Sequence, residues 1–262
     1  MKGGSQLDYV WALLCVVVVL IVRGVWHGWV GATPTKTPPV LSVDPGECRT
    51  QNPSSPEPEA VPNRGWLPNA AWKQIVFVDV ETTGLTAHDR IVTLAAILLD
   101  ASALVSGEVN LKVIYRIYNP GIACHPEASR IHGYSDSLLQ RQALFTGDAE
   151  EISEFLGRAD LVVCHNASFD LRFMNQALVS CKLPIISAQS YCTMENYRRQ
   201  YDGSARLDSA IARFGLKRES GRHGAFEDAW LTMNLFLRLN GVNACIQFEP
   251  IPEAQKVLQN LR

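Results

Sequence analysis

A short apolar run that carries two acids constrains this chain more than any other stretch. Residues 75–78 (Ile-Val-Phe-Val) have the β-branched and aromatic composition of a strand that is buried on both faces. Asp79 and Glu81 follow within the same run. Because side chains alternate along a strand, the two carboxylates point to one face, where they repel each other and are costly to desolvate. A bound cation removes both costs; alternatively, the strand ends early and both acids are solvated.

A second acid-bearing stretch follows another short apolar run, residues 161–164. Asn166 is a favourable N-cap residue, so Asp170 falls in the first or second turn of a predicted helix, just beyond the carboxyl end of a strand. Open α/β sheets bind their ligands at this position. Asp170 is therefore a candidate site residue, although an acid there can also complement the helix dipole.

A third stretch pairs a histidine with an acid, since His223 precedes Asp228 by five residues. Positions five apart on a helix diverge, so the two side chains share a site only if His223 lies on the loop before the helix. Gly224 permits such a break. Taken alone, His223 is more typical of a surface or capping histidine.

Composition restricts the class of protein. An apolar content of 47% and a charged content of 19% over 262 residues are sufficient for a sizeable hydrophobic core. The formal net charge of −2 means that a nucleic-acid partner would have to be held by a local patch or by metal. The seven cysteines include no Cys-x-x-Cys pair. This pattern argues against a zinc site and a disulfide framework and favours a reducing compartment.

The apolar periodicity predicts one α/β domain over residues 66–262. Strands are expected from residue 75 up to the break at Gly84 and over residues 90–99, 111–118, 161–164 and 185–191. Helices are expected over 126–139, 149–158, 167–180, 194–201, 206–214 and 226–239. The short loop 86–89 makes the first connection a hairpin-like reversal. Strands followed by alternating helices and strands indicate an α/β sheet of mixed direction that is covered by helices.

Four motifs occur in order between residues 73 and 240. They are Asp79-x-Glu81-Thr-Thr-Gly-Leu, Asn119-Pro120-Gly121-x4-Pro126-Glu127-Ala128-x2-Ile131-His132-Gly133, His165-Asn166-Ala-x-Phe169-Asp170 and His223-x4-Asp228. Together they resemble the DnaQ-like branch of the DEDDh family of 3′→5′ exonucleases, the branch that includes the proofreading subunit of bacterial DNA polymerase III. The resemblance implies an RNase H-like fold, in which a mixed five-stranded sheet is flanked by helices.

The resemblance also implies metal-dependent hydrolysis of phosphodiester bonds at DNA 3′ ends, with release of nucleoside 5′-monophosphates. Two Mg²⁺ or Mn²⁺ ions would be bound by Asp79, Glu81, Asp170 and Asp228, and His223 would accept the proton of the attacking water. The terminal nucleotide would be held by Thr82, Thr83, Leu85, His165, Asn166 and Phe169. Single-stranded DNA is the expected substrate. A 3′→5′ exoribonuclease and a non-catalytic, membrane-tethered nucleic-acid-binding module are the alternatives.

The chain departs from the family pattern in a few places. Thr93 stands where many relatives carry Glu, and Cys192 stands where an Asp is frequent. These differences bear on substrate detail rather than on the chemistry, because they leave the catalytic positions unchanged. The family's carboxy-terminal polymerase-binding tail is not recognisable, and Gln255-x-x-Leu258-x-x-Leu261 indicates an amphipathic helix more than a clamp-binding peptide. Association with a polymerase or clamp is therefore not supported.

Two segments precede the predicted domain. Residues 1–31 are mostly apolar, and the pattern from Tyr9 to Val30 has about the length needed to span a bilayer. We expect an uncleaved transmembrane helix here; a cleaved signal peptide and a buried core helix are the alternatives. Residues 32–65 are rich in proline and lack a periodic apolar pattern, which predicts a disordered linker.

The charges beside the apolar segment do not fix its orientation, because Lys2 and Arg23 flank it almost symmetrically. Unpaired cysteines and a nucleic-acid substrate both favour the cytoplasm. The expected location is the inner (cytoplasmic) membrane, with a single pass and with the catalytic domain in the cytoplasm.

Overall fold

The computed structural model describes residues 72–105, 109–218, 223–242 and 246. The predicted anchor and linker, residues 1–65, lie outside these ranges and remain predictions from the sequence. Within the described ranges, no helix combines the length and the apolar character needed to cross a membrane. The α/β domain begins at β1 (Gln74–Thr82).

Five strands form one mixed sheet in the order β3-β2-β1-β4-β5. The strands after β1 are β2 (Ile91–Asp100), β3 (Leu111–Ile117), β4 (Leu161–Cys164) and β5 (Gln189–Cys192). Strand β2 runs antiparallel to β1 and β3, whereas β4 runs parallel to β1 and β5. The predicted five-stranded sheet of mixed direction is therefore confirmed.

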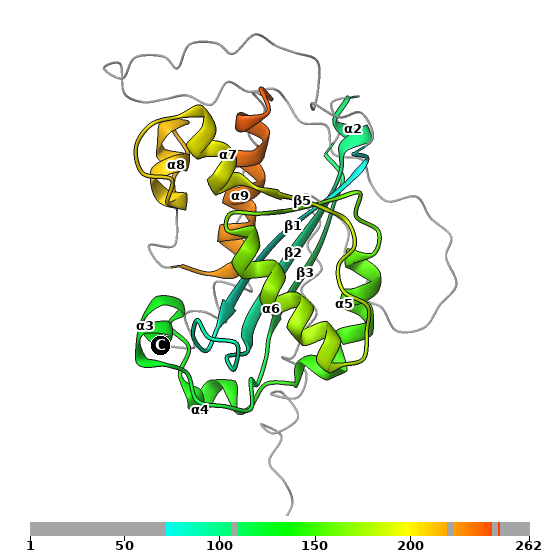
Figure 1. Ribbon diagram of the computed structural model, residues 1–262, viewed down its shortest axis with the longest axis vertical. Helices are drawn as coiled ribbons and strands as arrows, with labels where there is room; N and C mark the ends of the chain where they lie inside the picture. Colours follow the sequence, from blue (N-terminus) through cyan, green and yellow to red (C-terminus); the bar gives the residue numbers. More distant parts are fainter. Residues whose placement is uncertain (1–71, 106–108, 219–222, 243–245, 247–262) are drawn as a thin grey trace, which may run out of the picture.

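Helices connect the strands and cover the sheet (Figure 1). They are α2 (Ala101–Val105), α3 (Pro126–His132), α4 (Asp136–Leu139), the 3₁₀ helix η1 (Phe145–Gly147), α5 (Ala149–Leu156), α6 (Ala167–Ser180), α7 (Thr193–Gln200), α8 (Leu207–Arg213) and α9 (Ala225–Leu239). Helices α5 to α9 agree with their predicted ranges to within two residues at each end.

The central strand β1 is buried on both faces, as its apolar composition predicts. Ile75 and Phe77 belong to the hydrophobic cluster that α9 completes. Val76 and Val78 belong to a second cluster, on the other face, that α5 and α6 complete. Because alternate residues of a strand face opposite ways, Asp79 continues the face that α9 covers.

The segment predicted as one helix over residues 126–139 forms two helices, α3 and α4. Gly133 adopts a φ of 79° and caps α3, donating its N–H to the carbonyl of Ser129. Glycine reaches this left-handed conformation at little cost, so the helix ends there. Ser135 then begins α4, its hydroxyl accepting a hydrogen bond from the N–H of Leu138.

The last strand is shorter than its predicted range of residues 185–191, because β5 begins only at Gln189. The preceding backbone bonds to α6 instead: the N–H of Ile186 donates to Asn175 Oδ1 at 2.9 Å. Leu183 and Ile186 also pack against the hydrophobic cluster on the α6 side of the sheet. Apolar residues here serve packing rather than strand pairing.

Candidate active site

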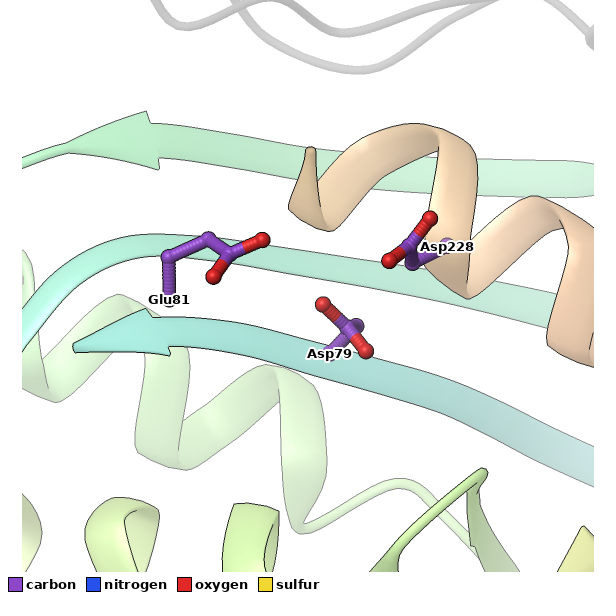
Figure 2. A group of neighbouring side chains, drawn as sticks. All are labelled: Asp79, Glu81 and Asp228. Atoms are coloured by element: carbon purple, nitrogen blue, oxygen red, sulfur yellow. The ribbon is translucent and has the colours of Figure 1, made fainter. Parts of the chain in front are cut away.

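Strand β1 and helix α9 bring three carboxylates together. Asp79 and Glu81 project from β1 on the face that α9 covers, and Asp228 projects toward them from the first turn of α9 (Figure 2). Each offers one oxygen, and these three oxygens lie within 4.8 Å of one another. The acids come from the centre of the sheet and from the last described helix, so only the folded domain assembles the group.

Burial and mutual repulsion disfavour the charged forms of these acids. Burial, and then the charges of the neighbouring acids, raise the pKa of Asp79 well above its usual value. Burial, and then the charge of Asp228, raise the pKa of Glu81 to about 7. A divalent cation offsets both effects, and carboxylate oxygens suit Mg²⁺ or Mn²⁺ better than zinc. The three side chains therefore fit such an ion.

Asp170 approaches the same end of β1 from α6, which covers the other face of the sheet. Strand β4 pairs with β1 only as far as Phe77, so the N–H of Val80 lies beyond the paired residues. Asp170 Oδ1 accepts a hydrogen bond from that N–H at 3.2 Å. Burial raises the pKa of Asp170 to about 8, despite this hydrogen bond. Asp170 thus lies beside the group of three carboxylates without belonging to it.

His223 lies on the chain just before α9, where its spacing from Asp228 requires it. The N-cap residue Gly224 has an extended backbone, which separates the histidine from the helix. Nδ1 of His223 lies 3.2 Å from Asp228 Oδ2, and 48% of the histidine side chain is exposed. The hydrogen bond to Asp228 raises the pKa of His223 above its usual value. The ring is oriented by an acid of the group while it still reaches solvent.

Comparison with known proteins identifies the family of this chain. Residues 76–236 match the RNase T family, which is described as exonuclease. The chain belongs to this exonuclease family. It is 33% identical over 175 residues to DNA polymerase III subunit epsilon of Rickettsia conorii. The alignment covers 63% of this chain and 73% of that protein. It is 28% identical over 194 residues to the subunit epsilon of Treponema pallidum. That alignment covers 70% of this chain and 86% of the other protein.

A solved structure shares the fold of this exonuclease. The nuclease domain of 3′hExo, a DEDDh family member bound to rAMP, superposes with a TM-score of 0.53 at 13% identity. The match covers 70% of this chain and 100% of that domain. Family and relatives together make the chain a 3′→5′ exonuclease.

The loop after β1 is built around a buried acid, Asp89. Its Oδ1 accepts a hydrogen bond from the Thr83 hydroxyl at 2.7 Å, and its Oδ2 accepts from the Thr86 hydroxyl and N–H at 2.7 and 2.8 Å. Although burial opposes the charged form, these hydrogen bonds lower the pKa of Asp89 below its usual value. A Cβ on Gly84 would lie 2.7 Å from the Asp89 oxygens and in conflict with the His125 ring. A larger residue here would therefore displace the Asp89 or His125 side chain.

The tip of this loop is held by α6. Leu85 is the most exposed large apolar residue that the structure describes, at 76%. Arg172 donates to its carbonyl at 3.0 Å, and Gln176 donates to the Ala87 carbonyl at 2.8 Å. Phe169 lies one turn before Arg172 on α6 and is partly buried. Two apolar side chains of the predicted nucleotide-binding set, Leu85 and Phe169, thus lie on segments that are tied together.

The remaining members of that set make internal contacts. Thr82 is buried and its hydroxyl donates to the Gly84 carbonyl at 2.6 Å. Asn166 is the N-cap residue of α6 but makes no capping bond with its side chain; its Oδ1 accepts from the Ser168 hydroxyl at 3.1 Å. These polar side chains shape the edge of the site from within.

His165 is partly buried just after β4, and both of its ring nitrogens contact other residues of the domain. Nδ1 of its ring lies 2.9 Å from the Thr193 hydroxyl, and Nε2 lies 3.0 Å from the Ala205 carbonyl. Burial lowers the pKa of His165 to about 4, so the ring is neutral near pH 7. These two contacts join the end of β4 to α7 and to the loop before α8.

Sequence reasoning missed Arg218, which contacts Asp228 through Nη1. The same nitrogen lies 3.6 Å from Glu227 Oε2, and Nη2 lies 3.1 Å from Asp208 Oδ1. The guanidinium thus supplies positive charge to an acid of the group of three carboxylates. Asp89 was missed as well. Both residues lie in polar loops, where neither apolar periodicity nor a family motif distinguishes them from surface charges.

Proposed function

We propose that this exonuclease hydrolyses the terminal phosphodiester bond at DNA 3′ ends and releases nucleoside 5′-monophosphates, with single-stranded ends preferred. The convergence of Asp79, Glu81 and Asp228 within 4.8 Å carries the proposal. The DNA substrate is supported by the relatives, which are named as subunits of a DNA polymerase.

The carboxylates would hold two divalent ions. Asp79, Glu81 and Asp228 would bind the first, and Asp79 with Asp170 would serve the second. When bound, Mg²⁺ or Mn²⁺ would supply positive charge to the attacking and leaving oxygens of the phosphodiester. The donor set supports this assignment, because the charge of Arg218 does not offset the burial and repulsion that raise the pKa values of Asp79 and Glu81.

The chain's own residues would position the reactants and move a proton. Asp228 holds Nδ1 of His223, which leaves Nε2 to accept the proton of the attacking water. Leu85 at the loop tip and Phe169 on α6 would pack against the terminal base. The contacts from Arg172 and Gln176 to the loop would keep this packing surface ordered before substrate arrives.

A matched pair of substrates tests the proposal. Purified protein with Mg²⁺ is given 5′-labelled single strands of DNA and RNA of one sequence. We expect a ladder that shortens from the 3′ end of the DNA, with nucleoside 5′-monophosphates as products. Asp228→Asn serves as the inactive control. Intact DNA in both Mg²⁺ and Mn²⁺ would contradict the proposal.

An exoribonuclease is the second candidate. The structural neighbour bound to rAMP supports it, because the same fold there holds a ribonucleotide. Faster shortening of the RNA strand in the assay above would favour this candidate over the first.

We further infer that residues 1–31 anchor the exonuclease in the inner (cytoplasmic) membrane as a single pass, with the catalytic domain in the cytoplasm. The apolar run from Tyr9 to Val30 supports the anchor. The free thiols of Cys124, Cys164, Cys181 and Cys192 support a reducing compartment. Full-length protein should fractionate with membranes, and protease outside intact spheroplasts should leave the domain uncut. A mature amino terminus near Thr33 would overturn the inference.

A further inference from the structure

A polar groove of about 560 Å³ lies beside the active site, between α6 and α7. Ser168 and Asn175 contribute to the wall from α6, and Asn196 and Arg199 contribute to the wall from α7. Strand β5 leads directly into α7 (Figure 1), and its last three residues line the groove as well. The volume is within the 300 to 1,000 Å³ that is typical of ligand sites. Most of the lining side chains carry hydrogen-bonding groups, so the groove suits a polar ligand.

The groove opens from the same edge of the sheet as the carboxylates. Strands β1, β4 and β5 run parallel, so their carboxyl ends meet at one edge. Ala167 and Ser168, which line the groove, are the first residues of α6, and Asp170 follows within the same turn. Cys192, at the end of β5, donates its thiol to the His165 carbonyl at 3.3 Å. A chain that leaves the catalytic group across the start of α6 therefore enters the groove.

Positive charge faces the groove from both walls. Arg199 lies in the last turn of α7, is exposed, and makes no hydrogen bond or ion pair with any residue that the structure describes. Arg172 lies on the α6 side, where one of its nitrogens donates to the Leu85 carbonyl. The single acid of the lining, Glu195, leaves this surface with an excess of positive charge.

This local charge matters because the whole chain carries a formal net charge of −2. An exonuclease of this kind cannot draw a polyanion by its overall field, so the substrate has to be held locally, by metal at the carboxylates or by a basic surface beside them. An arginine on the wall of a polar groove that makes no hydrogen bond or ion pair with a described residue can supply such a basic surface.

We propose that the groove holds the phosphodiester backbone of the substrate beyond its 3′-terminal nucleotide, with Arg199 as the principal phosphate-binding residue. The proposal rests on the proposed function, since it concerns the same nucleic-acid substrate. Two parts of the substrate would then contact different parts of the protein. The terminal nucleotide contacts the carboxylates and the tip of the loop after β1, and the upstream backbone contacts the groove.

Two substrates of different length separate these parts. The 4-nitrophenyl ester of thymidine 5′-monophosphate offers the reactive phosphodiester without an upstream backbone. Oligothymidylates of two, four and eight nucleotides add that backbone stepwise. With Mg²⁺ present, kcat/KM of the wild type should rise with oligomer length. Arg199→Glu should lower kcat/KM for the octamer by about tenfold and flatten the length dependence, because it reverses the charge that meets the phosphate.

The same variant should hydrolyse the nitrophenyl ester within about twofold of wild type, since no phosphate of that substrate reaches the groove. Arg199→Lys should restore most of the octamer activity. The slope of log kcat/KM against log salt for the octamer should fall by about 0.7 in Arg199→Glu, the value for one contact to a single strand. The matched control is Arg158→Glu, which reverses another exposed arginine at the far end of β4.

Three outcomes would overturn the proposal. In the first, Arg199→Glu lowers both activities equally, which would assign the residue to the fold or to the chemistry. In the second, octamer activity is unchanged, or falls as much in Arg158→Glu. In the third, the wild type hydrolyses neither substrate, and the proposed function fails together with this inference. The ester assay thus distinguishes a failure of the groove from a failure of the exonuclease assignment.

Discussion

Asp79 lies close to three other acids, and burial together with their charges raises its pKa. Asp79→Asn keeps the shape of the side chain and removes one charge. Without metal, we expect this variant to be more stable than wild type by about 1 kcal/mol, because a repulsive charge is lost. Its exonuclease activity should be undetectable. Urea unfolding in EDTA and the labelled-strand assay measure the two effects.

Asp202→Asn, at an exposed position, is the control for Asp79→Asn and should change neither quantity. If Asp79→Asn were instead less stable than wild type in EDTA, the favourable contacts of the Asp79 carboxylate would outweigh its repulsion by the other acids. Near-normal turnover in that variant would remove Asp79 from the site.

His223 is expected to accept the proton of the attacking water and not to bind the metal ion. His223→Ala should therefore reduce kcat by about 10² to 10⁴. The affinity for Mg²⁺ should change little, because Nδ1 of His223 contacts Asp228 from outside the group of three carboxylates. Steady-state kinetics and calorimetric titration with Mg²⁺ check these expectations. Equal losses in kcat and in metal affinity would indicate that the histidine supports Asp228 instead.

His132 gives the domain a predictable response to acid. The side chain is 6% exposed, and its Nδ1 accepts a hydrogen bond from the N–H of Tyr134 at 3.0 Å. Burial lowers the pKa of His132 to about 4, although the charge of Asp136 opposes this shift. An unfolded histidine titrates near 6.5, so below that pH the unfolded chain binds the extra proton. Stability is therefore lost as the pH falls from about 7 to 4.

The stability difference between wild type and His132→Gln isolates this effect, because the carboxylates are common to both proteins. We expect that difference to decrease by about 2 kcal/mol between pH 8 and pH 5. Urea unfolding of both proteins at the two pH values provides the measurement. A difference that does not change with pH would mean that His132 titrates alike in the folded and unfolded chains.

At the scale of elements, the loop between β1 and β2 is fixed by contacts with no spare volume. Gly84→Ala would place a methyl group 2.7 Å from the Asp89 oxygens, so the loop would have to shift. We expect a loss of about 1 to 3 kcal/mol in stability. KM should rise more than kcat falls, because the shift moves Leu85 and not the carboxylates.

Gly147→Ala is the matched control, since nothing lies within 4 Å of the added carbon there. Thermal unfolding and steady-state kinetics on a single-stranded oligomer compare the two variants. Equal behaviour of the two would show that the loop adapts at no cost.

The elements of this fold were predictable where one strong pattern governed each of them. The apolar run of β1 predicts a buried strand, and the amphipathic runs of the later helices predict helices, from a few neighbouring residues alone. The break at Gly133 was missed because a left-handed glycine cap and a helix interior differ only in backbone dihedral angles. The shortening of β5 was missed because Leu183 and Ile186 pack beneath α6, a contact that no local pattern encodes.

Some residues of the site could likewise be predicted from the sequence and others could not. Motif residues such as Asp79, Glu81 and Asp228 were found from chemistry and family resemblance, and the structure gathers them. Asp89 and Arg218 were not found, because their importance depends on which side chains they meet in three dimensions. His165 carried a motif position, yet its two hydrogen bonds give it an internal contact that the motif does not reveal.

At the scale of the whole molecule, metal binding and folding are linked. An ion that binds only the folded carboxylate group stabilises the domain by about 2.7 kcal/mol at a concentration one hundred times its dissociation constant. We therefore expect Mg²⁺ to raise the unfolding temperature of wild type by several degrees. Glu81→Gln, which removes one ligand, should reduce that increase. Differential scanning calorimetry with and without Mg²⁺ measures it, and an equal increase in both proteins would place the bound ion elsewhere.

The position of Asp228 on the last described helix has a consequence for synthesis. A ribosome delivers β1 first, so a growing chain carries Asp79 and Glu81 long before Asp228 exists. Until the residues of α9 have emerged, β1 also lacks the helix that covers one of its faces. A truncated or half-made chain thus holds some of the acids, and we expect it to be inactive until Asp228 joins them.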